Sequence, residues 1–489
     1  MKKIGIIGSG IGGIALGLRA AKKGYEVHIF DKNPYPGGKL AEIKFSGFRF
    51  DAGPSLFTQP NLVDELFELF GKNPRDYFNY KQLDTICHYF WEDGTQLKTH
   101  KNPEKSIQEI AEQLGEDPKA IQTYFQHFKQ AFEIIQPLFL EKSLHQVSTW
   151  TSKEALKGYL NIPKLGIHTS MNTFHESRFK NPKTVQLFNR YATYNGSDPY
   201  QTPATLTVIP HLEFHLGAYF PKGGMIEIVN SLVRLANEIG IQFHLNEAVE
   251  EIQIKNGIAT GFRTSKDFHE FDYIGSNSDI TPLYQKLFKS TDIKIPEKLL
   301  QQEKSSSGII FYWGIKKQFS QLGVHNIFFS ENYKAEFSSI FKDKNIYHDP
   351  TIYLHISSKI EKNDASEGGE NWFILINTPH NIGQNWEENV AKSKAFVIQK
   401  LNRILGISVD ELIEDQDYLD PQRIEERTSS AGGALYGNSS NNAFAAFLRH
   451  PNFSSKIPNM LWVGGSVHPG GGIPLCLSSA KIASQALSN

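Results

Sequence analysis

The sequence has little cysteine. Only Cys87 and Cys476 occur in 489 residues. Two cysteines cannot build a disulfide framework, and neither belongs to a cluster with metal-ligand spacing, so we predict no metal site. Cysteine this sparse and unpaired is typical of a reducing compartment, and we expect the protein in the cytoplasm.

An excess of charge of one sign is also missing. Lysine and arginine total 51 and aspartate and glutamate total 52, which leaves a net charge of -1. A surface that binds nucleic acid needs a basic excess. The sequence therefore predicts no nucleic-acid partner.

Long hydrophobic runs are absent as well. No stretch reaches the ~18 apolar residues of a membrane span. The first apolar run, Ile4 to Ile7, is broken by glycine and is too short for the ~7–15 residues of a signal-peptide core. What the chain does have is aromatic residues, with 34 Phe and 19 Tyr. Such a chain can line a long apolar cavity or carry an apolar surface patch.

Residues 121–142 concentrate these aromatic residues at helical spacing, up to a kink or end expected at Pro137. One interpretation is a helix that faces the core, which we favour because amphipathic helices are common in globular proteins. The other is an interfacial helix that dips into lipid and surrounds the mouth of a cavity. The residues concerned are Tyr124, Phe125, Phe128, Phe132, Ile135, Phe139 and Leu140.

The N-terminus predicts a βαβ unit. Lys3 to Ile7 reads as a buried strand, residues 13–23 as a helix, and Tyr25 to Phe30 as a second strand. Residues 39–50 alternate around Ser46-Gly47 and predict a hairpin.

Further along, the pattern predicts a mixture of helices and strands without repeats or linkers, so we expect domains interleaved in sequence. We expect helices near residues 60–70, 103–136, 223–239 and 386–405, and from Pro474 onward. We expect strands at 241–246, 249–254, 257–262, 271–275, 309–316, 325–330, 351–357, 372–377 and 460–463.

A glycine motif, Gly8-x-Gly10-x-x-Gly13, lies between the first strand and the first helix. Gly8 permits a tight turn, Gly10 lets a diphosphate approach the backbone, and Gly13 lets the helix pack on the strand. Asp31 follows the second strand, where a carboxylate binds ribose hydroxyls. With strand, helix and acid all in place, dinucleotide binding is favoured over a purely structural turn.

Four further segments carry a resemblance to a known family. Gly37-Gly38-Lys39 follows the acid, residues 195–204 and 211–224 are rich in Pro and Gly, and residues 461–474 contain His-Pro-Gly-Gly-Gly-Ile-Pro. Together they resemble the bacterial carotenoid and phytoene desaturases, FAD-dependent oxidoreductases of the amine-oxidase branch. The family often has Glu at the position of Asp31 and Arg at that of Lys39, and both differences keep the charge.

This resemblance implies an α/β fold in which a discontinuous Rossmann-like FAD-binding domain encloses a mixed α+β substrate domain. The FAD domain is expected at residues 1–75, 221–290 and 421–489, and the substrate domain at 76–220 and 291–420. The FAD contacts implied are Gly8, Gly10, Gly12, Gly13, Asp31, Lys32, Gly38, Lys39, Val249, Asp279, Gly465, Ser466, Gly472, Ile473 and Pro474.

The resemblance also implies the introduction of a C–C double bond into a long acyclic carotenoid. Within the family the chain is most similar to 1-hydroxycarotenoid 3,4-desaturases. The alternatives are a phytoene or diapophytoene desaturase, a carotenoid isomerase or saturase, an amine oxidase, and a non-catalytic carotenoid carrier. The expected partners are a lipophilic carotenoid, a membrane surface bound peripherally, and oxygen or a quinone as electron acceptor.

Catalytic residues are less clearly marked. Desaturation needs a hydride acceptor, which FAD supplies, and a group that receives a proton. His211, Glu213 and His468 lie in the family-like segments and are the residues we name for that role. For each, a structural hydrogen-bonding role is the alternative we favour, because most polar side chains satisfy local bonds.

Overall fold

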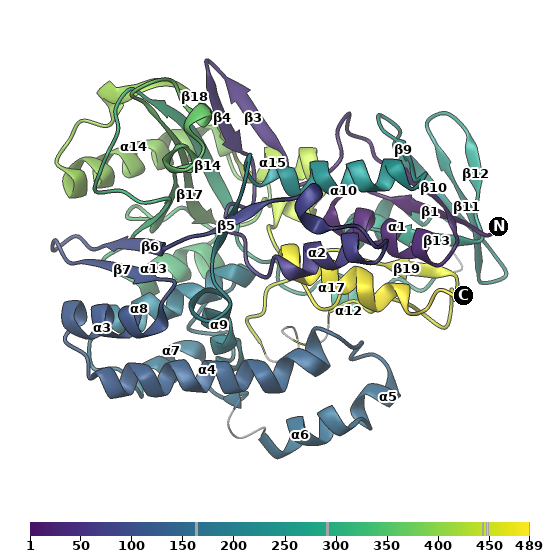
Figure 1. Cartoon of the computed structure of the whole chain (residues 1–489), viewed down its shortest axis with the longest axis horizontal. Coiled ribbons are helices and arrows are strands. Elements are labelled where there is room, and N and C mark those ends of the chain that lie inside the picture. Colours follow the sequence, from purple (N-terminus) through teal and green to yellow (C-terminus); the bar gives the residue numbers. More distant parts are fainter. Residues whose placement is uncertain (162–164, 290–292, 443–444, 446, 448, 489) are drawn as a thin grey trace.

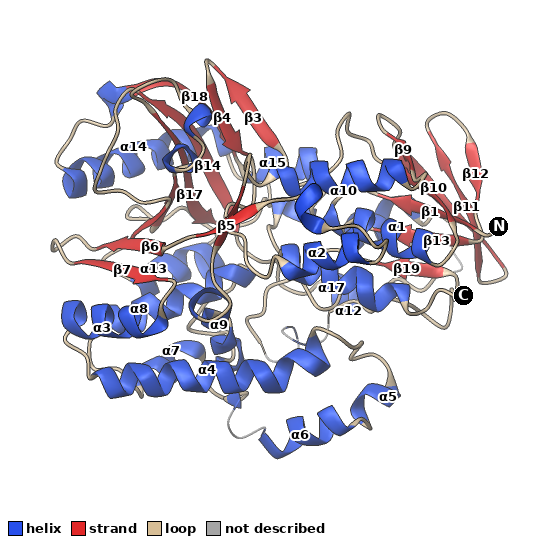
Figure 2. Cartoon of the chain, in the orientation of Figure 1, coloured by secondary structure: helices blue, strands red, loops and turns tan. Residues whose placement is uncertain are grey.

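The structure, a computed structural model, describes residues 1–161, 165–289, 293–442, 445, 447 and 449–488. Two large sheets organise the chain, one near each end of the molecule's long axis (Figure 1). Helices cover both sheets (Figure 2), and a bundle of helices lies along one side.

The first sheet is parallel and combines strands from near the N-terminus with one from the C-terminal part of the chain. Its strand order is β19-β13-β1-β2-β9. Parallel sheets are covered on both faces, so their strands read as apolar runs, and this explains Ile4, Ile6 and Ile7 in β1. Its strands are β1 (Lys3–Ile7), β2 (Glu26–Phe30), β9 (Gln242–His244), β13 (Tyr273–Ser276) and β19 (Met460–Trp462).

Different layers cover the two faces of this sheet. On one face Ile4 and Ile6 pack in a core with α1 (Ile11–Lys22), α10 (Ile226–Glu238) and α17 (Ile473–Ser484). On the other face lies a three-stranded sheet of β10 (Val249–Lys255), β11 (Ile258–Thr264) and β12 (Phe268–Glu270). Gly5 faces that layer: a Cβ there would lie 2.4 Å from the ring of Phe271.

The second sheet is mostly antiparallel, with the order β18-β14-β17-β16-β15-β6-β7. The helix α14 (Trp386–Leu405) packs on its aromatic face through Val397 and Leu401. The strands are β6 (Thr85–Phe90), β7 (Gln96–His100), β14 (Ser307–Ile315), β15 (His325–Phe328), β16 (Ile352–His355), β17 (Glu370–Thr378) and β18 (Ile413–Leu419).

A helical layer packs against β6 and β15 through a core that includes Phe125, Phe128 and Phe188. Its long helices are α3 (Pro103–Leu114) and α4 (Pro118–Phe139). The same layer also contains the shorter helices α7 (Met171–Glu176), α8 (Pro182–Asn189) and α9 (Pro210–Phe214). Two short helices, α5 (Val147–Trp150) and α6 (Lys153–Asn161), extend from the end of α4 along the lower margin of Figure 1.

The remaining elements are short. The pairs β3 (Glu42–Phe45) with β4 (Phe48–Asp51), and β5 (Tyr80–Gln82) with β8 (Tyr219–Pro221), form two small ribbons. The other helices are α2 (Asn61–Glu68), α11 (Ile280–Pro282), α12 (Glu297–Leu300), α13 (Tyr333–Ser338) and α15 (Pro421–Thr428). Across the described ranges, we find no helix with the length and apolar character of a bilayer span.

Most of the predicted elements are confirmed, including the βαβ unit, the hairpin at Ser46-Gly47 and the helix at 386–405. The helical region expected near 103–136 is confirmed, and the structure divides it into two helices. Gly115 adopts φ +64° and ends α3, and the side chain of Asp117 then caps α4. Pro137 lies inside α4, which ends two residues later. The strands β6, β7 and β18 had not been predicted.

The two interpretations of residues 121–142 are also resolved. Tyr124, Phe125, Phe128 and Phe132 are buried, so the core-facing interpretation is confirmed for these aromatic residues and the lipid-facing one is wrong. In the last turns of α4, Phe139 is only partly buried and, like Phe132, lines a cavity.

Candidate functional site

A cavity of about 1120 Å³ opens at the carboxyl edge of the parallel sheet and extends between α4 and the second sheet. Parallel α/β sheets bind their ligands at this edge. Sites for one drug-sized molecule usually measure roughly 300–1,000 Å³, so this cavity exceeds a single such ligand. Its wall combines glycine-rich turns at one end with apolar side chains such as Phe132, Ile327 and Phe373 at the other.

The glycine motif forms one end of the cavity. Gly8, Gly10 and Gly12 line it, and the Gly37 N–H donates to the Ser9 carbonyl at 2.9 Å, which joins the second glycine pair to the first turn. Gly13 has the packing role predicted for it, because a Cβ there would lie 2.1 Å from the Gly8 carbonyl oxygen.

Two helices begin at the cavity wall without a side-chain cap. The helix α1 starts after Gly10, and α17 starts after Gly472, and neither has a capping side chain. The first N–H groups of a helix lack partners within the helix and favour an anion. Two such helix starts and a glycine turn on one cavity fit a dinucleotide diphosphate and a ring that accepts electrons, so the residues present fit FAD.

Asp31 lies at the end of β2 and lines the cavity. Its Oδ2 accepts hydrogen bonds from the N–H and hydroxyl of Ser9, at 2.8 and 2.7 Å, and its Oδ1 accepts from the Asn33 N–H at 2.9 Å. The carboxylate therefore supports the glycine turn as well as facing the cavity. The neighbouring Lys32 donates to the Glu426 carbonyl at 2.6 Å, and burial lowers the pKa of Lys32.

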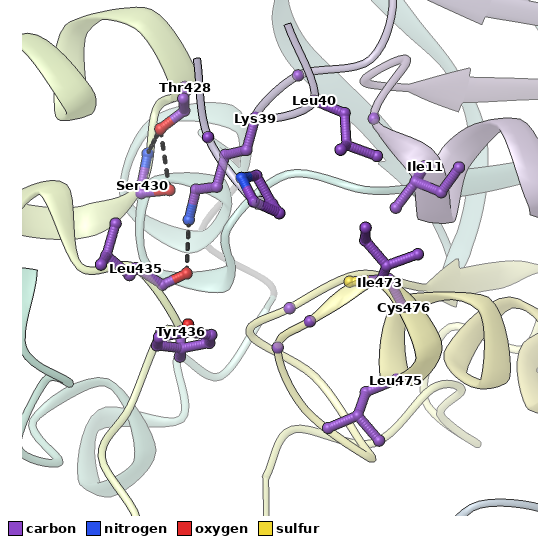
Figure 3. Close-up of a pocket in the computed structure, with 18 of the residues that line it drawn as sticks. Ile11, Lys39, Leu40, Thr428, Ser430, Leu435, Tyr436, Ile473, Leu475 and Cys476 are labelled. Carbon is purple, nitrogen blue, oxygen red and sulfur yellow. Dashed lines mark hydrogen bonds between the residues drawn. The ribbon is translucent and has the colours of Figure 1, made fainter. Parts of the chain in front are cut away.

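Lys39 crosses from the glycine pair to the opposite wall. Its Nζ donates to the carbonyls of Leu435 at 2.8 Å and Ala434 at 3.2 Å, as Figure 3 shows for Leu435. Burial lowers the pKa of Lys39. In the same view, Ile473 lies across the cavity from the hydrogen bond between Lys39 and Leu435.

The other FAD contacts expected from the sequence converge on the same cavity. Asp279 caps α11 through the Thr281 N–H at 2.9 Å, and the Ser466 hydroxyl accepts from the Ile280 N–H at 3.1 Å. Of the residues predicted to contact FAD, the structure places all but Gly13 in the cavity wall: Gly8, Gly10, Gly12, Asp31, Lys32, Gly38, Lys39, Val249, Asp279, Gly465, Ser466, Gly472, Ile473 and Pro474.

The three residues named for catalysis lie in different places. Glu213 lines the cavity. His211 stacks on Phe132 with ring centroids 4.5 Å apart, and His468 donates through Nε2 to the Lys142 carbonyl at 2.9 Å. Neither histidine is one of the described cavity-lining residues. Burial lowers the pKa of each to about 4, so both are neutral near pH 7.

Glu213 belongs to a buried ion pair. The Arg190 guanidinium donates to Glu213 Oε2 at 3.0 Å, and the Tyr191 hydroxyl donates to the same oxygen at 2.7 Å. Tyr194 donates to the other oxygen. Buried ions need partners of this kind, and the cluster fixes Glu213 in the wall.

Several cavity residues had not been predicted. Asn277 directly follows β13, and its side-chain amide lies where Cβ atoms on Gly10 and Gly12 would fall. Its position at the carboxyl end of a parallel strand could have pointed to it. Ser55, His325 and Tyr353 carried no local signal, because they come from three separate segments.

Comparison with known proteins gives the family. The model described as flavin containing amine oxidoreductase matches residues 11–310. The chain is 53% identical over 489 residues to a 1-hydroxycarotenoid 3,4-desaturase from Flavobacterium sp. (strain P99-3), covering 100% of this chain and 99% of the relative. It is 30% identical over 483 residues to a 4,4'-diaponeurosporene oxygenase from Staphylococcus aureus (strain MSSA476), covering 98% and 97% of the two chains.

Among solved structures, an oxidoreductase from Methanosarcina mazei aligns with a TM-score of 0.65 at 13% identity, over 99% of each chain. At that identity the likeness shows the fold alone. It agrees with the predicted α/β class.

Proposed function

The chain belongs to the flavin containing amine oxidoreductases and, within them, to the carotenoid desaturases, and we propose that it introduces the 3,4 double bond into a 1-hydroxylated acyclic carotenoid. It is an FAD-dependent oxidoreductase that acts on CH–CH groups. The finer choice of substrate rests on the 53% identity to a 1-hydroxycarotenoid 3,4-desaturase over the whole chain.

One observation supports the proposal above the others. A single cavity joins the FAD-binding turns to an apolar chamber lined by Phe132, Phe139 and Phe373. A small amine would need a small pocket, whereas a polyene needs a long apolar one. A diapophytoene or phytoene desaturase, an isomerase or saturase, an amine oxidase and a carrier are all less favoured by the comparisons.

The chain's residues have distinct parts in this reaction. When bound, FAD supplies the hydride acceptor. The glycine turns and helix starts would hold its diphosphate, and Asp31 would accept hydrogen bonds from its ribose. The apolar wall orients the polyene and excludes water. Of the three residues proposed for catalysis, Glu213 is the one in the described cavity wall. Its carboxylate oxygens accept hydrogen bonds from Arg190 and Tyr194, so we assign it the role of positioning these two side chains.

Peripheral membrane attachment in the cytoplasm belongs to the same proposal. A long polyene partitions into lipid, so the enzyme must meet it at a membrane surface. We assign this contact to α5 and α6, where Val147, Leu156 and Leu160 are 80%, 61% and 75% exposed. Exposed apolar groups gathered on neighbouring elements mark an interaction surface. Oxygen or a quinone would then reoxidise the flavin.

The division into domains is likewise proposed. All five strands of the parallel sheet fall within residues 1–75, 221–290 and 421–489, and all seven strands of the second sheet fall within 76–220 and 291–420. This distribution supports an interleaved FAD domain and substrate domain. The boundary at residues 290–291 lies outside the described residues.

A substrate panel tests the proposed function. The purified holoenzyme is given phytoene, lycopene and a 1-hydroxylated acyclic carotene, and products are measured by mass and absorption maximum. We expect the hydroxylated substrate to gain one double bond at its hydroxylated end, with anaerobic bleaching of the flavin in step. Efficient conversion of phytoene with the hydroxylated substrate untouched would overturn the choice of substrate, and a flavin that stays yellow with every substrate would indicate a carrier.

A further inference from the structure

A buried polar cluster interrupts the apolar wall of the cavity. It consists of Ser55, in the loop after β4, His325, which opens β15, and Tyr353 in β16, and all three line the cavity. The Tyr353 hydroxyl lies 2.7 Å from the Ser55 hydroxyl and 2.8 Å from His325 Nδ1. We call these three residues the hydroxyl cluster.

The backbone explains why the cluster forms. His325 and His355 are paired residues on adjacent strands, and Tyr353 precedes His355 by two, so the three side chains share one face of the sheet. The rings of His325 and His355 stack with centroids 5.0 Å apart. His355 is not one of the described cavity-lining residues, so it supports His325 from within the fold.

His325 is left with an unused hydrogen-bonding atom. Its Nε2 has no partner among the described residues, although the side chain is only 3% exposed. Burial, with a smaller effect of Arg190, lowers the pKa of His325 to about 3, so the imidazole is neutral. Buried polar atoms are almost always bonded, and one that is not calls for a ligand or a water.

The chemistry of that atom selects the ligand. If Nδ1–H donates to Tyr353, Nε2 is an acceptor; if Nδ1 accepts from Tyr353, Nε2–H is a donor. A hydroxyl both donates and accepts, so it matches either tautomer. A carbonyl would match only the second tautomer, and an alkyl end would leave Nε2 unpaired.

The loop that carries Ser55 connects the cluster to the FAD end of the cavity. A Cβ on Gly53 would lie 2.2 Å from the Lys39 carbonyl oxygen, so the chain that leads into Ser55 passes against the expected FAD-contacting loop. In a 1-hydroxylated chain, three bonds of about 1.5 Å separate the oxygen from C3. A group that binds this hydroxyl must therefore stand beside the reacting carbons, and the approach of the Ser55 loop to Lys39 is the observation that favours the cluster for this position.

We propose that His325, oriented by Tyr353 and Ser55, binds the hydroxyl of the substrate's 1-hydroxylated end and so determines both substrate choice and the position of the new double bond. This inference rests on the proposed function, because it presupposes a hydroxylated substrate. The Arg190–Glu213 cluster is a less suitable partner, since the carboxylate oxygens already accept bonds from arginine and tyrosine.

The test compares two substrates in matched variants. The ratio of kcat/KM for a 1-hydroxylated acyclic carotene to that for the same carotene without the hydroxyl is measured in wild type, Tyr353→Phe, His325→Phe and His325→Gln. We expect wild type to favour the hydroxylated substrate by about a hundredfold or more, because an unpaired buried partner rejects the analogue. Tyr353→Phe and His325→Phe should lower that ratio about tenfold or more, and His325→Gln should restore part of it.

Binding provides a readout apart from turnover. The Kd of the hydroxylated carotene for the holoenzyme with its flavin reduced beforehand, measured under anaerobic conditions by quenching of tryptophan fluorescence, should rise about tenfold in Tyr353→Phe. Tyr333→Phe is the matched control, since Tyr333 also lines the cavity but lies outside the hydroxyl cluster. Because Tyr353→Phe keeps the ring, it remains informative even if His325→Phe does not fold.

The outcomes separate the two proposals. If wild type shows no preference for the hydroxylated substrate, the proposed substrate fails whatever the variants do. If wild type has the preference and Tyr353→Phe and His325→Phe keep it, the role of the hydroxyl cluster is refuted. An equal loss of turnover on both substrates would also refute it, because that result indicates a proton acceptor or a structural role.

Discussion

Asp31 combines two roles at one carboxylate. Three hydrogen bonds from Ser9 and Asn33 hold it, and it faces the cavity where the ribose of FAD is expected. Asp31→Ala should weaken FAD binding about tenfold or more, since hydrogen bonds to a charged group are worth ~1.5–3 kcal/mol. Titration of the apoprotein with FAD measures this. The control is Asp84→Ala, which alters an exposed aspartate. Unchanged FAD affinity in Asp31→Ala would show that Asp31 does not contribute to FAD binding.

Glu213 is expected to matter through the fold. The Arg190 and Glu213 side chains are both buried, and removing one partner of a buried pair leaves an uncompensated charge that costs about 3–5 kcal/mol. Glu213→Ala should therefore lower the unfolding temperature markedly in a thermal melt of the holoenzyme. Glu112→Ala, an exposed glutamate, should change stability by less than about 0.5 kcal/mol. A variant that melts like wild type but is inactive would instead support a catalytic Glu213.

Single residues were predictable only where a local motif fixes them. The glycine turn and Asp31 are read within one βαβ unit, because the turn, the helix start and the acid follow one another along the chain. His325, Tyr353 and Ser55 meet only when β15, β16 and the loop after β4 are assembled, so no spacing in the sequence brings them together.

At the scale of elements, the proposed contact of α5 and α6 with lipid can be tested. Val147→Asp, Leu156→Asp and Leu160→Asp, singly or combined, should reduce co-sedimentation with liposomes, because each places a charge on the apolar surface. FAD content should not change, since these side chains lie outside the described wall of the cavity.

The matched control is Ile382→Asp, which alters an equally exposed apolar residue away from these helices. It should sediment with liposomes like wild type. If the three variants on α5 and α6 sediment equally well too, these helices are not the membrane contact.

Prediction succeeded for several elements that carry a local pattern, and the strand β18 shows one reason why it failed elsewhere. The helix α14 and the hairpin at Ser46-Gly47 carry their own signals. The edge strand β18, Ile413–Leu419, contains three acidic residues and pairs with β14, about a hundred residues earlier. Its strand conformation depends on that distant partner, which single-sequence patterns do not reveal.

At the scale of the whole molecule, the cavity ties together segments from both chain ends and from the middle. The glycine turn near the N-terminus, the loop after β13 and the start of α17 all line it. Each of these segments has N–H groups or a side chain that find no hydrogen-bond partner within their own element. The uncapped starts of α1 and α17 are examples. Bound FAD would therefore act as a shared partner for parts of the chain that are more than 400 residues apart.

Removal of FAD should accordingly lower hydrogen-exchange protection around the parallel sheet and leave the protection of the second sheet unchanged. A ligand present at a hundred times its Kd stabilises the folded state by about 2.7 kcal/mol, so the apoprotein should melt at a lower temperature. In hydrogen exchange, protection should fall in the segments 8–13, 37–40 and 464–474, which contribute residues to the FAD end of the cavity wall. The strands β14 and β17 in the second sheet should keep their protection because their bonds are made within that sheet. A uniform loss of protection across both sheets would contradict the proposed division into an FAD domain and a substrate domain, since it would show that the two unfold as one unit.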